Sequence, residues 1–138
     1  MPAPIPSLPA GAPESAVLEA LDEHGVVILD DFLLPTVVDA FNAEVDLLIE
    51  AERDVVRDFP NEAIASFFGD AVTHLSGLAG KSKTFVEHVL CHPRYMAICD
   101  AVLLPRCADY RLNIAHLMER RPGSEAQMLH RDAWVWKR

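Results

Sequence analysis

The β-strand pattern of this chain is concentrated near its C-terminal end, and this position limits the folds that the chain can form. Residues 110–118 alternate between an apolar face that carries Leu112, Ile114 and Met118 and a mixed face, and the turn signal RPGS leads into a second extended pattern at 125–136. Two strands are too few for an independently stable sheet, and their edges would stay open. Either the earlier strands, near residues 26 and 72, join this sheet or the fold is unfinished. We favour the second and expect an α+β fold that is incomplete within the 138 residues.

Helical periodicity accounts for most of the preceding sequence. Pro35 stands where helices often begin, and the apolar residues that follow it recur at helical spacing. Pro93 divides a later apolar segment, because proline ends one helix and can open the next. Helices are predicted over 15–24, 35–53, 82–91 and 93–104, a buried strand at 26–29, and a second short strand at 71–78.

Charge and composition exclude some classes of partner. The chain has 21 acidic and 12 basic residues, a formal charge of −9, so phosphate backbones and anionic lipid surfaces would be repelled. No apolar run reaches the roughly 18 residues of a membrane helix. Cys91, Cys99 and Cys107 fit neither a paired disulfide framework nor a metal knuckle. We expect a soluble cytoplasmic protein with buried free thiols, and no binding to nucleic acid or membranes.

The first residues differ in composition from the rest. Residues 1–13, MPAPIPSLPAGAP, are rich in proline, which favours an extended backbone without a packed core. We predict that this segment is a disordered arm and that one folded domain covers residues 14–138.

The stretch QMLHRDAWVW places His130 and Asp132 two residues apart. On an extended strand, side chains at i and i+2 point to the same face, so this imidazole and this carboxylate would converge. Together they would supply two of the three protein ligands of the facial triad that binds Fe(II) and leaves open positions. The alternative interpretation is a surface strand on which the two side chains share a solvated hydrogen bond.

Three segments together resemble one known family. LDEHGVVILDDFLLPTVV near the start, VEHVLCHPRYMAICDAVL in the middle and QMLHRD near the end are similar, in order and spacing, to the phytanoyl-CoA dioxygenase family of Fe(II)/2-oxoglutarate-dependent oxygenases. The resemblance covers about residues 15–134. It implies that N-terminal helices precede the first strands of a double-stranded β-helix, or jelly roll, and that His130 and Asp132 are iron ligands.

The resemblance also implies an activity and further site residues. With 2-oxoglutarate as co-substrate, the protein would hydroxylate or otherwise oxidise a hydrophobic small molecule and release succinate and carbon dioxide. Gln127 matches a position that contacts the 2-oxoglutarate carboxylate in some members, and Asn113 falls where members line the pocket with polar groups. Met118 and Trp134, on the predicted site-bearing strands, suit a hydrophobic substrate. The alternatives are a polar residue on a mixed strand face for Asn113 and plain core packing for the two apolar residues.

The sequence departs from the family after Asp132. The family's distal iron-binding histidine, and the arginine that binds the far carboxylate of 2-oxoglutarate, lie well downstream of this position, whereas the sequence ends six residues after Asp132. We therefore expect a truncated chain that is inactive alone. His116, on the neighbouring predicted strand, is a candidate third ligand, and its other interpretation is a core or edge histidine.

Two alternatives from other classes stay open. The chain could be a catalytically inactive partial domain that serves as an interaction module, in which case open strand edges would favour self-association. It could instead hold zinc in a non-redox site formed by His130, Asp132 and a third histidine such as His116. Metal content distinguishes the three: iron with 2-oxoglutarate turnover, no metal, or zinc.

Overall fold

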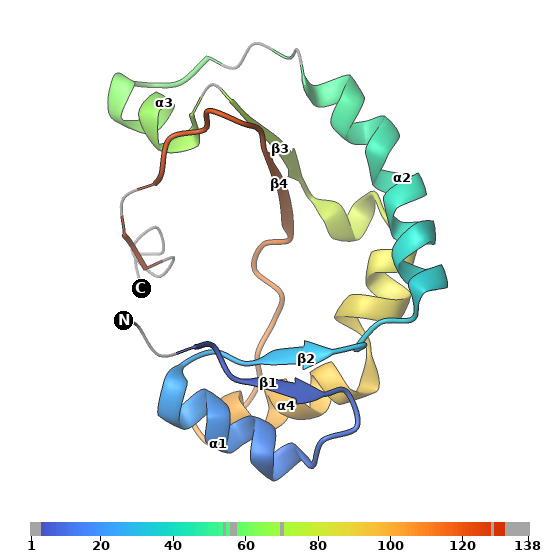
Figure 1. Cartoon of the computed structure of the whole chain (residues 1–138). Coiled ribbons are helices and arrows are strands. Elements are labelled where there is room, and N and C mark those ends of the chain that lie inside the picture. Colours follow the sequence, from blue (N-terminus) through green and yellow to red (C-terminus); the bar gives the residue numbers. More distant parts are fainter. Residues whose placement is uncertain (1–3, 54, 56–57, 70, 128, 132–138) are drawn as a thin grey trace.

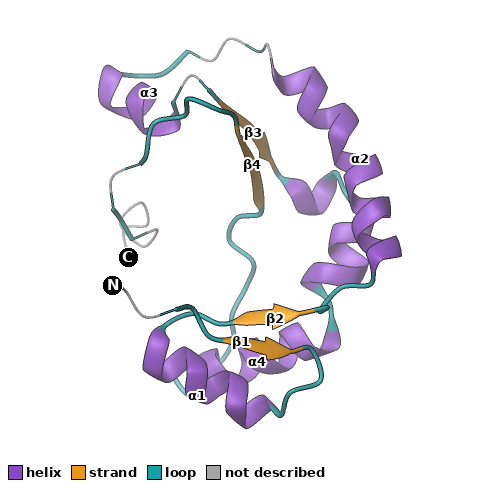
Figure 2. Cartoon of the chain, viewed as in Figure 1, coloured by secondary structure: helices purple, strands orange, loops and turns teal. Residues whose placement is uncertain are grey.

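Helices and short strands are interspersed along the chain, and the fold is α+β (Figure 2). The structure is a computed structural model that describes residues 4–53, 55, 58–69, 71–127 and 129–131. The elements, in chain order, are β1 (Ser7–Pro9), α1 (Glu14–His24), β2 (Ile28–Asp30), α2 (Pro35–Arg53), α3 (Glu62–Phe68), β3 (Val72–Ser76), the 3-10 turn η1 (Leu78–Gly80), the π-helix η2 (Phe85–Leu90), α4 (Pro93–Leu103) and β4 (His116–Arg120).

Two separate two-stranded sheets organise these elements (Figure 1). The parallel pair β1–β2 lies at the same end of the molecule as α1 and α4, whereas the antiparallel pair β3–β4 packs against α2. The described residues form no closed barrel. The mixed fold class is therefore confirmed, and the jelly roll stays a prediction.

The parallel sheet uses part of the proline-rich N-terminal segment. Ser7–Pro9, within the segment predicted as a disordered arm, pairs in register with Ile28–Asp30, and the Ser7 hydroxyl donates to the Asp30 carboxylate. The strand predicted at 26–29 thus forms, but its predicted burial is wrong, since Val26 is 42% and Ile28 46% exposed. The reason is that the buried core cluster forms around α2, β3 and η1, and neither Val26 nor Ile28 belongs to it.

Local sequence signals set the ends of the helices. Gly25 ends α1 in the left-handed conformation at φ 71°, and its amide donates to the Leu21 carbonyl over 2.9 Å, as expected of a glycine C-cap. Pro93 begins α4, as predicted. Arg94, one residue later, donates to the carbonyl of Ala12, which fixes α4 beside α1. The four predicted helical segments are therefore confirmed, with π-type hydrogen bonding in the third.

The central core lies between α2 and one face of the antiparallel β3–β4 pair. We call this pair the β3–β4 hairpin, although residues 77–115, which include η1, η2 and α4, connect its two strands. Val45 and Ile49 of α2, Leu75 of β3 and Leu78 of η1 form a buried cluster, and Leu117 of β4 packs against it. Leu75 is fully buried, at 0% exposure. Burying a leucine side chain contributes roughly 1.5–3 kcal/mol, so this cluster is the main source of order in the hairpin.

The structure corrects the prediction for residues 110–118. Only His116–Arg120 forms a strand, because β3 ends at Ser76, which pairs with His116 at the last rung of the ladder. The buried face is also the opposite of the one predicted. Leu117 packs on the core, whereas Met118 is 49% and Ile114 53% exposed. Pairing with Leu75 sets the register of Leu117, and alternation then turns its neighbours away from α2.

The strand predicted at 125–136 does not form in the described part of that segment. The chain turns at Gly123, where φ is 88°, and continues irregularly through residues 125–127 and 129–131. The Ser124 hydroxyl donates to the Ala71 carbonyl over 2.8 Å, which ties this segment to the start of β3 rather than to the edge of β4. Residues 132–136 lie outside the described residues.

Two further sequence expectations can be compared with the structure. None of the described helices is both long and apolar enough to cross a membrane. Cys91, Cys99 and Cys107 are free thiols, as predicted, but Cys91 and Cys107 are exposed and Cys99 is half-buried. The predicted burial is wrong because Cys91 and Cys107 fall just beyond helix ends rather than on a packed face.

Replacing Leu75 with alanine should lower the free energy of unfolding by about 3 kcal/mol, because a fully buried leucine leaves a cavity between α2 and the hairpin. Urea denaturation followed by circular dichroism measures the change. Leu47→Ala is the matched control, since Leu47 lies on α2 but is 78% exposed, and it should change stability by less than about 0.5 kcal/mol. Equal effects of the two substitutions would contradict this description of the core.

Candidate functional site

The β3–β4 hairpin presents two different faces. The α2 face carries Leu75 and Leu117 and is covered by the core. Residues directly opposite in an antiparallel ladder share a face, so Thr73 and Glu119 also lie on the α2 face. We call the opposite side the α3 face, because Phe68 of α3 contacts it. The α3 face carries Val72, His74 and Ser76 of β3 and His116, Met118 and Arg120 of β4.

Two of the predicted site residues lie on or next to the α3 face. Met118 is exposed on it, and His116 is exposed two residues earlier on the same strand. Asn113 is also exposed, but it lies in the irregular segment before β4 and not on a strand. The candidate third ligand and a candidate pocket residue are therefore accessible from one side of the hairpin.

The proposed ligand segment follows the hairpin. His130 is exposed and Gln127 is half-buried, both in irregular backbone beyond the turn at Gly123. In Figure 1 the chain leaves the top of β4 and runs towards the end of the molecule that holds α3. Asp132 and Trp134 lie outside the described residues, so the convergence of His130 with Asp132 stays a prediction.

The donor chemistry can be judged from the described residues. His130 and His116 are both exposed, and imidazole and carboxylate ligands together suit non-haem Fe(II). Among the described residues, no three histidine, cysteine, aspartate or glutamate side chains are grouped closely enough to hold a metal ion. Any site at His130 therefore needs donors from beyond that set, and the sequence places Asp132 two residues away.

One residue of the α3 face was not predicted from the sequence. His74 is 4% exposed, and its ring meets the Phe68 ring edge-on at a centroid distance of 4.6 Å. Its Nε2 atom lies 3.3 Å from the Phe68 carbonyl oxygen. The sequence signal was the pattern VTHLS, in which a histidine interrupts a short apolar strand on the face opposite Leu75.

A charged network reinforces the α2 face. Arg53 at the end of α2 donates to Glu119 of β4 over 3.0 Å, and the Thr73 hydroxyl donates to the same carboxylate over 3.1 Å. The hydrogen bond from Arg53, with that from Thr73, holds the pKa of Glu119 below its ordinary value. The network fixes β4, and hence the direction in which Met118 points.

A second carboxylate fixes the start of the connection between β3 and β4. Glu44 of α2 accepts hydrogen bonds from the hydroxyls of Ser82 and Thr84, both at 2.6 Å, and from the Thr84 amide. The Ser82 hydroxyl also accepts from the Phe85 amide over 2.9 Å, so Ser82 caps the helical segment that leads into η2. The bond from Ser82, followed by that from Thr84, lowers the pKa of Glu44.

Most of the chain matches one family model. Residues 21–138 match the family model for phytanoyl-CoA dioxygenase (PhyH). The chain belongs to the phytanoyl-CoA dioxygenase family. The match includes all the helices from α2 onward, both strands of the hairpin and the segment with His130, and it confirms the resemblance seen in the sequence.

Relatives within this family carry dioxygenase names. The chain is 35% identical over 128 residues to dioxygenase trt7 of Aspergillus terreus, covering 93% of this chain and 43% of that protein. It is 34% identical to dioxygenase olcK of Penicillium canescens, covering 91% and 42%. It is 31% identical to the Fe(II)/2-oxoglutarate-dependent dioxygenase nvfF of Aspergillus novofumigatus, covering 90% and 42%. The chain thus spans less than half the length of these relatives.

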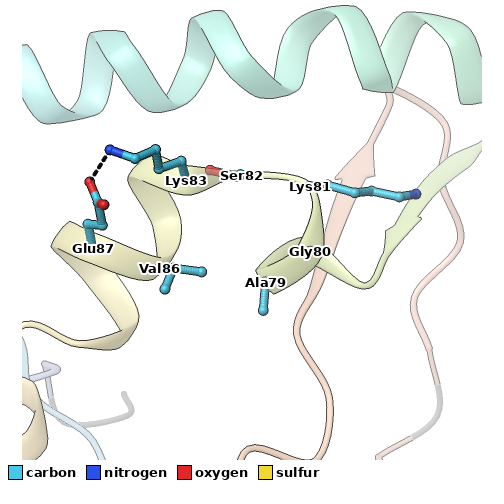
Figure 3. A pocket seen from close by; sticks show the side chains of 7 residues that line it. All are labelled: Ala79, Gly80, Lys81, Ser82, Lys83, Val86 and Glu87. Atoms are coloured by element: carbon cyan, nitrogen blue, oxygen red, sulfur yellow. Dashed lines mark hydrogen bonds and ion pairs between the residues drawn. The ribbon is translucent and has the colours of Figure 1, made fainter.

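A shallow hollow elsewhere on the surface is a weaker candidate for a site. Ala79, Gly80, Lys81, Ser82, Lys83, Val86 and Glu87 line it (Figure 3). The Lys83 ammonium is paired with Glu87 at 2.8 Å, and the Lys81 ammonium lies 3.9 Å from Glu52. Both cations are therefore already opposed by carboxylates, and none of the family-implied site residues lines the hollow.

Replacing Glu119 with glutamine should weaken the dependence of stability on acid. Because the folded-state pKa of Glu119 is lowered, its contribution is present above its ordinary pKa of 4.5 and is lost as the pH falls through the folded-state value. Urea midpoints between about pH 7 and about pH 3 should therefore fall less steeply in Glu119→Gln than in the wild type. Glu19→Gln, at an exposed position on α1, is the control. Parallel curves for Glu119→Gln and the wild type would contradict the network.

Proposed function

We propose that this chain is part of an Fe(II)/2-oxoglutarate-dependent dioxygenase that hydroxylates, or otherwise oxidises, a hydrophobic small molecule. The observation that carries the proposal is family membership over residues 21–138, a range that includes both His130 and Asp132. The name of nvfF supports iron and 2-oxoglutarate as the metal and co-substrate. Succinate and carbon dioxide would be the co-products.

His130 and Asp132 are the proposed iron ligands, and Gln127 is proposed to bind the carboxylate of 2-oxoglutarate. When bound, Fe(II) and 2-oxoglutarate supply the oxidising chemistry, and the protein contributes binding, orientation and exclusion of water. The exposure of the His130 imidazole fits this role, and the tie between Ser124 and Ala71 brings the ligand segment back to the hairpin. Asn113, Met118 and Trp134 are proposed to line the substrate pocket.

The proposed domain is the N-terminal portion of a jelly roll that residues 14–138 begin. In this proposal β3 and β4 are neighbouring strands of the barrel, and the α3 face points to its interior. The exposure of Met118 supports this orientation, because an apolar side chain on a strand face is covered when further strands are added. The distal histidine and the arginine of the family would come from those strands.

Replacing His130 with alanine should remove iron binding. The variant should retain less than about a tenth of the wild-type iron after anaerobic loading, because a facial triad that loses one imidazole keeps too few protein donors. Metal content by mass spectrometry and succinate formation from 2-oxoglutarate are the measurements. His88→Ala is the matched control, since His88 is exposed on η2, and it should keep full iron content. Equal iron in both variants would contradict the assignment.

The same metal measurement separates the alternatives. Zinc in place of iron, lost on replacing His116 as well as His130, would favour a non-redox zinc site. No metal in the wild type, together with concentration-dependent self-association in sedimentation experiments, would favour an inactive interaction module. The second outcome is motivated by the exposed apolar residues Leu112, Ile114 and Met118 near the edge of β4.

A further inference from the structure

The α3 face carries an aromatic cluster that the proposed ligands do not explain. The rings of Phe59 and Phe68 stack with centroids 5.0 Å apart and planes inclined by 22°. Phe68 in turn meets His74 at 4.6 Å and an interplanar angle of 61°. His74 pairs across the ladder with Met118, which is 49% exposed. The aromatic cluster and the accessible Met118 therefore border the same part of the α3 face.

His74 determines where this cluster lies. Phe68 is the last residue of α3, and its carbonyl is one of those that a helix end does not pair internally. With Nε2 of His74 at 3.3 Å, the ring can donate a hydrogen bond to that carbonyl. Because α3 has only 7 residues, it has little stability of its own, and contacts with the hairpin must hold it in place.

The other end of α3 is fixed independently. The Asn61 side chain accepts a hydrogen bond from the Ile64 amide over 3.0 Å, an N-cap that stabilises the first turn. The cap defines the helix but does not contact the hairpin. His74 contacts Phe68 both through its ring and through the Phe68 carbonyl, and a leucine of similar size in its place would lack the donor.

We propose that Phe68 is a specificity-determining residue of the proposed oxygenase and that His74 is its positioning residue. The proposal rests on the proposed function and deepens it by naming a substrate class: an uncharged compound with an apolar ring. Small-molecule pockets are lined mainly by apolar and aromatic side chains, and aromatic rings contact other rings in offset or edge-on geometry. The stacked rings of Phe59 and Phe68 offer apolar surface without a charged group, which suits an uncharged ring compound.

The test measures binding of prodan, an uncharged naphthalene dye whose emission shifts to the blue in an apolar site. Phe68→Ala should raise the Kd of prodan by about fivefold or more. Phe32→Ala is the matched control, because Phe32 makes a comparable contact with His92, at 4.4 Å, away from the α3 face, and it should change the Kd by less than about twofold. Unchanged binding in Phe68→Ala, or an equal loss in Phe32→Ala, would overturn the proposal.

Further variants distinguish positioning from folding. His74→Leu should weaken dye binding as much as Phe68→Ala, and His74→Gln, which keeps a donor, should restore part of the affinity. If Phe68→Ala fails to fold by circular dichroism, Phe68→Leu keeps apolar volume, loses the ring and should still weaken binding. Met118→Arg should abolish binding, whereas Leu47→Arg, 78% exposed on α2, should not. Full binding in Met118→Arg would place the dye elsewhere and overturn the proposal.

The dye requires neither metal nor co-substrate, so the two proposals fail in different ways. If the wild-type protein binds no iron, but Phe68→Ala loses dye binding, the aromatic site would be supported and the oxygenase function contradicted. If the protein binds iron and forms succinate, but Phe68→Ala leaves dye binding unchanged, the oxygenase function would be supported and the aromatic site contradicted. In an active enzyme, Phe68→Ala should raise KM for a ring substrate.

Discussion

The packing of α2 across the β3–β4 hairpin is the interaction on which the rest of the structure depends. Leu75 is fully buried. It packs with Val45 and Ile49 of α2, and Leu117 of the neighbouring strand lies beside it on the same face. A two-stranded hairpin is marginally stable alone, so burial against a helix is what orders it. Once Leu75 and Leu117 face α2, alternation along the strands commits their neighbours to the opposite face.

Because side chains alternate along the strands, the hairpin has one side that packs against α2 and an opposite side that we propose serves function. The structural side is closed by apolar packing and by the Arg53 and Glu119 pair. The opposite side carries the accessible Met118 and His116, and α3 reaches it through Phe68. Under the proposed oxygenase function this division has a purpose, since such an enzyme would need an apolar pocket next to its metal ligands.

The sequence predicted what local pattern determines and missed what pairing determines. The helices α1, α2 and α4 and the glycine that ends α1 followed from spacing and from the conformational freedom of Gly25, whereas α3 was not predicted as a helix. The buried face of 110–118 was predicted wrongly, because both faces carry apolar residues and only the pairing with Leu75 decides which is covered. His74 could not be assigned, since its partner Phe68 lies in a separate helix. The pairing of His130 with Asp132 came from the sequence alone.

The proposed function depends most on metal binding at His130, which we propose lies on the side of the β3–β4 pair that carries Met118. Anaerobic titration with Fe(II), followed by NMR of the histidine imidazoles and methionine methyl groups, tests it most directly because paramagnetic broadening falls steeply with distance. The account predicts that the His130 signals broaden first and the Met118 methyl next, while those of His24, which lies beside Glu23 on α1, stay sharp. Broadening that begins at His24, or that affects all histidines alike, would contradict it.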